Sequence, residues 1–73
     1  MTDNKPLCPR CEGHGVIDHV RINALQINIY LCDECNAFWF KKEDISVDSF
    51  EEFGPFMESK GLTEAPSEVT FLD

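Results

Sequence analysis

Two pairs of cysteines constrain this chain more than any other feature of its sequence. Two residues separate Cys8 from Cys11 in C-P-R-C, and Cys32 and Cys35 have the same spacing in C-D-E-C. Twenty residues lie between the pairs, a separation typical of four-cysteine zinc sites and long enough for two strands and a turn. Because zinc takes four ligands at the corners of a tetrahedron and each turn presents two thiols, the spacing predicts one Zn²⁺ per chain. Its ligands would be Cys8, Cys11, Cys32 and Cys35.

The chain is short enough to need such a site. Its 73 residues make at most one domain, and a domain of this size buries only about 60% of its unfolded surface. The N-terminal M-T-D-N-K-P lacks the apolar core of a secretory signal, and no stretch approaches the roughly 20 apolar residues of a membrane span. We therefore expect a cytoplasmic protein that does not bind membranes. In a reducing compartment paired cysteines bind metal more often than they form disulfides.

Hydrophobic alternation predicts a β-hairpin at residues 16–31, between the cysteine pairs. In the second arm, Q-I-N-I-Y-L, the side chains of Ile27, Ile29 and Leu31 share one face. The first arm alternates less cleanly, because an aspartate interrupts its apolar face. We place the turn near Asn23, since asparagine tolerates left-handed backbone conformations.

The aromatic run F-W-F at residues 38–40 predicts a short third strand. In a strand, Phe38 and Phe40 point to one face and Trp39 to the other. Asn36 follows the second cysteine pair, where we expect it to adopt a left-handed conformation in place of glycine. In the first pair, Gly13 and Gly15 are expected to bend the chain at φ values that other residues avoid.

A helical segment is predicted after the third strand. Asp48 is a candidate N-cap with Glu51 completing a capping box, and Ser46 is a second candidate. Gly54-Pro55 interrupts the segment, so we expect a kink there, and Gly61 is expected to end it. The residues at helical spacing are Phe50, Phe53, Phe56 and Met57.

The stretch C-P-R-C … I-N-I-Y-L-C-D-E-C-N-A-F-W-F resembles the zinc-ribbon family related to transcription factor IIB, in its bacterial form C-P-x-C … C-x-x-C-x-x-x-W. The likeness covers about residues 8–44. The family usually has glycine where Asn36 and Ala37 stand, and Glu43 or Asp44 falls near its acidic position. The resemblance implies a structural zinc and no catalysis, and it does not specify a partner. The matching positions are Cys8, Pro9, Cys11, Cys32, Cys35, Trp39 and Phe40.

Together these observations predict a small zinc-bound domain. Two C-x-x-C turns on a β-hairpin with a short third strand would form a zinc ribbon, followed by one or two short C-terminal helices. The expected divisions are a flexible lead-in at residues 1–6, the ribbon at 7–45, a helical segment packed on it at 46–62, and a mobile acidic tail at 63–73.

The uneven charge favours a protein partner. Residues 1–42 hold five acids and five bases, whereas residues 43–73 hold nine acids and one base, which accounts for the net charge of −8. We therefore predict a non-enzymatic adaptor that binds a protein with a basic surface. The residues expected at that interface are Trp39, as a ring shared between core and surface, and Asp48, Glu51 and Glu52.

Two alternative functions remain open. A transcription-type zinc ribbon would bind nucleic acid, with Arg10, Arg21, Lys41 and Lys42 as its phosphate contacts. A neutral ribbon half, a Zn(Cys)₄ site of charge about −2 and an acidic tail all disfavour that reading. Four thiolates can also bind iron, as in rubredoxin, or cycle as redox dithiols. His14 is an alternative ligand, but four cysteines already fill a tetrahedron and leave no open position for catalysis.

Overall fold

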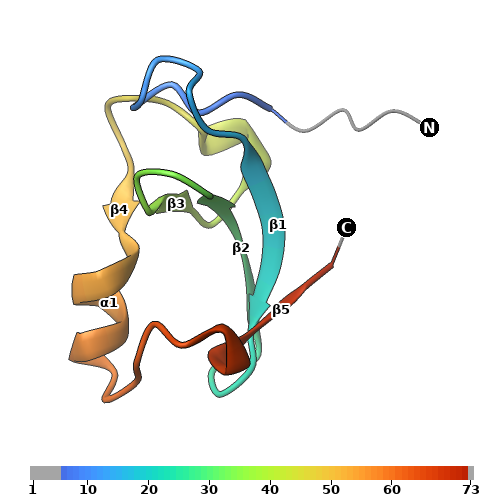
Figure 1. The fold of residues 1–73 in the computed structure, drawn as a ribbon, viewed down its shortest axis with the longest axis vertical. Helices are drawn as coiled ribbons and strands as arrows, with labels where there is room; N and C mark the ends of the chain where they lie inside the picture. The colour runs from blue at the N-terminus through green and yellow to red at the C-terminus, as the bar shows by residue number, and fades with distance from the viewer. Residues whose placement is uncertain (1–5, 73) are drawn as a thin grey trace.

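The computed structural model of the chain describes residues 6–72. Within this range five strands form one antiparallel sheet in the order β4-β3-β2-β1-β5 (Figure 1). The strands are β1 (Ile17–Ile22), β2 (Ile27–Cys32), β3 (Ala37–Trp39), β4 (Glu51–Glu52) and β5 (Val69–Phe71). The helices are α1 (Phe53–Ser59) and two 3₁₀ turns, Lys42–Asp44 and Pro66–Glu68. No helix in this part of the chain is long and apolar enough to cross a membrane.

The predicted hairpin is confirmed, but its turn differs in detail. β1 and β2 pair in register from Ile17 opposite Cys32 to Ile22 opposite Ile27. The left-handed residue of the turn is Gln26, with φ 57°, and not Asn23. Asn23 is held instead by the C-terminal segment, because its side chain accepts a hydrogen bond from Thr70 Oγ1 at 2.9 Å. The polar groups of an asparagine suit this bridging role.

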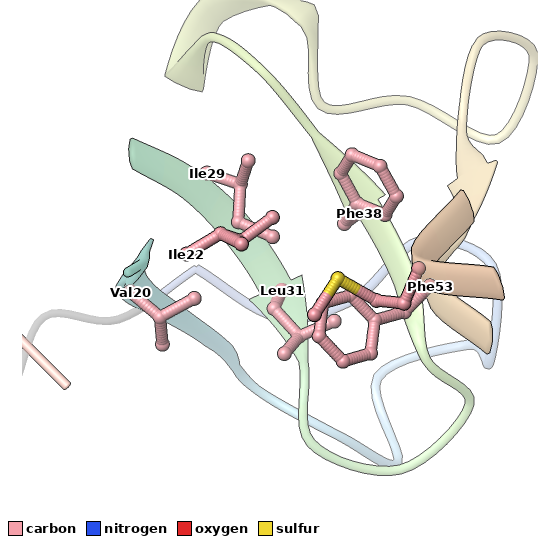
Figure 2. Packing of buried hydrophobic residues seen from close by; sticks show 7 residues of the cluster. Val20, Ile22, Ile29, Leu31, Phe38 and Phe53 are labelled. Atoms are coloured by element: carbon pink, nitrogen blue, oxygen red, sulfur yellow. The ribbon is translucent and has the colours of Figure 1, made fainter. Parts of the chain in front are cut away.

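The sheet buries side chains on both faces, in two separate clusters. On one face, α1 covers a cluster centred on Phe38, which packs edge-on against Phe53 and Phe56. Figure 2 shows the side chains of this cluster pointing into the same space between sheet and helix. On the other face, Trp39 packs with Ile17 and Phe50 beside the cysteines. The predicted alternation of Phe38 and Trp39 is therefore confirmed, and each face has its own aromatic centre.

The predicted start of the helix is wrong. Asp48 caps no helix and Glu51 forms no capping box, since Glu51 lies in β4 opposite Phe38 of β3. Serine hydroxyls stabilise a turn in this segment instead: Ser46 Oγ accepts a hydrogen bond from the backbone N–H of Asp48 at 3.3 Å. The one α-helix of residues 6–72 begins at Phe53, and its proline lies in the first turn, where a missing N–H is tolerated.

The helix ends at Ser59, and Gly61 is the C′ residue that terminates it, as predicted. Gly61 has φ +73°, and its N–H donates to the carbonyl of Glu58 at 3.0 Å. The N–H of Leu62 donates to the carbonyl of Met57 at 2.8 Å. These two bonds form a Schellman motif, which requires the left-handed conformation that glycine adopts without strain.

The C-terminal segment belongs to the sheet, in contrast to the mobile tail expected at residues 63–73. β5 pairs with β1 and places Phe71 opposite Val20. The backbone N–H of Leu72 donates to the carbonyl of His19 at 2.9 Å. Of the lead-in expected at residues 1–6, all but Pro6 lies outside the described residues. The carbonyl of Pro6 accepts a bond from the N–H of Ile17 at 2.8 Å.

Candidate metal centre

The fold brings the four cysteines together at one end of the hairpin. Cys8 Sγ lies 3.6 Å from Cys35 Sγ, and Cys11 Sγ lies 3.7 Å from Cys32 Sγ. All four sulfur atoms lie within 4.8 Å of one another, and none forms a disulfide. A tetrahedron with Zn–S bonds of 2.3 Å has its corners about 3.8 Å apart. The thiols are therefore placed to bind one four-coordinate metal ion.

Each cysteine pair is positioned by a tight backbone turn. In the first, the N–H of Cys8 donates to the carbonyl of Gly15 at 3.0 Å, and the N–H of Gly13 donates to the carbonyl of Cys8 at 2.9 Å. In the second, Cys32 Sγ accepts backbone N–H bonds from Glu34 and Cys35, at 3.3 and 3.4 Å. Such bonds offset negative charge on a thiolate.

The residue after each pair is left-handed. Asn36 has φ 62°, as predicted, and Glu12 occupies the same place after Cys11 with φ 58°. The conformation of Glu12 is not among the predictions from the sequence, although the matching spacing of the two turns is a signal for it. Gly13 bends at φ 84°, as expected.

Gly15 serves a different purpose from the one predicted. The φ of Gly15 is not positive. A Cβ atom at this position would lie 2.8 Å from Cys32 Sγ. Its role is to let the first turn approach the second closely, so that the thiols converge. Close approach of a backbone is a recognised reason for glycine, distinct from its freedom in φ.

Burial and backbone dipoles act on the thiols in opposite directions. Burial raises the pKa of Cys8 to about 12 and raises the pKa of Cys35. Burial also opposes ionisation of Cys32, but the N–H groups of Cys35 and Glu34 that bond its sulfur hold the pKa of that thiol below its ordinary value. Since metal ions bind the thiolate form, binding must displace protons from this cluster and is favoured as the pH rises.

Two side chains connect the cysteine turns to the rest of the sheet. Asp33 Oδ1 accepts a bond from the N–H of Val16 at 3.1 Å. The guanidinium of Arg10 donates to the carbonyl of Cys35 at 3.4 Å, pairs with Glu52 at 3.3 Å and lies 4.4 Å over the ring of Phe50. From the sequence, Arg10 is predicted only as a phosphate contact. In the structure this arginine is engaged within the domain.

The expected interface ring is not at the surface. Trp39 is 1% exposed, and its Nε1 donates to the carbonyl of Ser46 at 3.1 Å. The prediction of a ring shared between core and surface is therefore wrong. Asp48, Glu51 and Glu52 are exposed, as expected, although Glu52 pairs with Arg10. His14 is exposed and does not belong to the group of four potential ligands.

Comparison with known proteins leaves the site to be interpreted from its geometry. No protein-family model, curated protein or solved structure matches this chain. The structure itself shows a small compact domain with an antiparallel sheet and four cysteines that fit one metal ion. Its assignment to the zinc ribbons related to transcription factor IIB stays a prediction from the sequence.

Proposed function

We propose that the chain is a non-enzymatic, cytoplasmic zinc ribbon whose structural Zn²⁺ supports a protein-interaction surface. The observation that carries this proposal is the convergence of four thiols from two turns at the spacing of a tetrahedron. Thiolate-only sites favour zinc or iron among the available metals. Four protein ligands leave no open position for a reactive water, which favours a structural role.

The partner that we propose is a protein with a basic surface. Acidic side chains from residues 43–52 are exposed around the 3₁₀ turn and β4. Like charges would repel phosphates, and a nucleic-acid partner would need a basic stripe. Arg10 is engaged with Glu52 and Phe50, which reduces the basic side chains available for such a stripe. Exposed acids around an interface set association rate and specificity more than affinity.

Metal analysis tests the identity of the ion. Protein expressed with zinc and iron both supplied is expected to contain one zinc per chain, because the Cys₄ set and its flanking residues fit a zinc ribbon. Elemental mass spectrometry measures the stoichiometry, and a Cys8→Ser/Cys35→Ser variant serves as the control that has lost half the thiols. Iron in the site, with visible thiolate charge-transfer absorption, would support the rubredoxin-like alternative instead.

Charge reversal tests the partner class. Protein captured from a lysate by the zinc-loaded chain is expected to associate several-fold more slowly with Glu51→Lys than with the unaltered protein, and the difference should fade as salt rises. Glu58→Lys makes the same change in net charge on the outer surface of α1 and is the matched control. Stopped-flow fluorescence gives the rates. Equal effects of both variants, or capture of nucleic acid at about 150 mM salt, would argue against this partner.

A further inference from the structure

A cleft of about 350 Å³ opens on the helix-covered face of the sheet, between β5 and the start of α1. Much of its apolar lining comes from three elements that are distant in sequence: Leu31 of β2, Phe53 of α1, and Val69 and Phe71 of β5. The candidate metal ligand Cys32 and Asn36 also line it, so the cleft adjoins the second cysteine turn. Figure 2 shows Leu31 and Phe53 pointing into the shared interior from sheet and helix. The cleft therefore continues the apolar cluster out to the surface.

Every charged side chain that lines this cleft is acidic. The acidic residues among the described lining are Asp18, which is buried, and Asp33 and Glu64, and no lysine or arginine belongs to this described lining. Asp33 and Glu64 are exposed, so their carboxylates lie at the rim. An apolar cleft with an acidic rim complements an apolar side chain that is flanked by basic ones.

Phe71 stands at the open side of the cleft. Its side chain is 59% exposed, and the neighbouring Leu72 is also exposed. Val69, on the same face of β5, packs against the buried cluster, so the strand itself is anchored. A large ring held on an anchored strand with most of its surface in water offers a ready contact for a partner.

The outer edge of β5 offers backbone hydrogen bonds beside the cleft. Glu68 and Leu72, which flank β5, turn backbone groups toward β1: the carbonyl of Glu68 accepts from the N–H of Asn23, just after β1, and the N–H of Leu72 donates to the carbonyl of His19. By the alternation of antiparallel ladders, Val69 and Phe71 turn theirs away from β1. β5 is the last strand in the sheet, and no described strand pairs with its outer edge. An extended peptide can add there as a sixth strand.

We propose that the cleft and the outer edge of β5 bind an extended basic segment of a partner protein. The segment pairs with the backbone of Val69 and Phe71, inserts an apolar side chain against Phe71 and Phe53, and directs flanking lysines or arginines to the acidic rim. This inference rests on the proposed function and adds to it, because it gives the basic partner a second contact, at the edge of the sheet opposite β4. The net charge of −8 disfavours a second copy of this chain as the occupant.

A bead-displayed library of random heptapeptides, screened against the zinc-loaded protein, tests the proposal. We expect enrichment of sequences that alternate apolar residues with lysine or arginine. Affinities of the enriched peptides, measured by fluorescence anisotropy, should fall about tenfold with Phe71→Ser and with Glu64→Lys. Val47→Ser and Glu58→Lys, which change an exposed apolar residue and an exposed acid outside the cleft, should stay within about twofold. Amide exchange at Val69 and Phe71 should slow in the complex.

Other outcomes would contradict peptide binding in the cleft, and they can be told apart from a failure of the proposed function. Failure to enrich basic sequences, or equal losses with the control variants, would exclude the cleft as their site. A dimer that Phe71→Ser dissociates, seen by analytical ultracentrifugation, would assign the edge to a second copy. If the peptides lose affinity only with Glu51→Lys, a basic partner is still supported, but its binding site lies at β4. If the metal-free protein is folded and still binds the peptides tightly, the cleft is supported as their site and a structural role for zinc is contradicted.

Discussion

Removal of the metal is expected to unfold the domain. A structural zinc contributes on the order of 10 kcal/mol to folding in zinc-finger peptides, whereas a chain of 73 residues has a total stability of roughly 4–11 kcal/mol. Cys8 and Cys32 are fully buried and lie where the first turn meets the end of β2. Without an ion the two cysteine turns would lose the four metal–sulfur bonds that join them. A chelator should therefore collapse the amide dispersion of the NMR spectrum, and Cys32→Ser should do the same.

Two controls separate loss of metal from damage to the chain. Re-addition of Zn²⁺ after chelation should restore the dispersed spectrum, because the ligands themselves are intact. Cys35→His keeps four ligands in a Cys₃His set that zinc also accepts, and we expect it to retain a folded spectrum. A metal-free protein with full dispersion would show that the two apolar clusters fold the domain without help.

Phe38→Ala is expected to lower the free energy of unfolding by about 3–5 kcal/mol, the usual loss when a buried phenylalanine is replaced by alanine. Phe38 is fully buried, and ring contacts join it to Phe40, Phe53 and Phe56 at centroid distances of 5.3, 6.1 and 5.0 Å. Phe38→Ala would leave a cavity between β3 and α1. Urea unfolding measures the loss, with the fluorescence of Trp39, the single tryptophan, as the signal.

Phe40→Ala is the matched control for this truncation. Phe40 lies two residues along on the same face, but its side chain is 48% exposed. Phe40→Ala would lose the ring contacts with Phe38 and Phe56 but little buried area. We therefore expect the free energy of unfolding to fall by about 1–2 kcal/mol. Equal costs for the two variants would contradict a core centred on Phe38.

Local patterns in the sequence were sufficient to predict the end of the molecule that holds the four cysteines. The C-x-x-C spacing predicted which four residues converge, and the alternation of Ile29 and Leu31 predicted the buried face of β2. Asn36 and Gly61 were found from their tolerance of left-handed backbone. These features depend on residues that are close in sequence, where side-chain period and backbone sterics act directly.

The metal and partner predictions differ in how far the sequence could support them. Thiol spacing restricts metal geometry strongly, because a short turn can hold its two cysteines in few ways. The exposure of Trp39 depends on what covers it, and the turn that includes Ser46 closes over the indole. The periodicity of the sequence does not predict the contact between this turn and the indole.

The sequence by itself determined the four-cysteine cluster, the hairpin and the end of α1. Only the tertiary structure decided that Glu51–Glu52 form a strand and that Val69–Phe71 complete the sheet beside β1. Both short segments are strands because a distant strand satisfies their backbone groups, since two or three residues have little intrinsic preference of their own. The same pairing sets Phe71 beside Leu31 and Phe53. The cleft therefore arises from contacts between residues far apart in the chain.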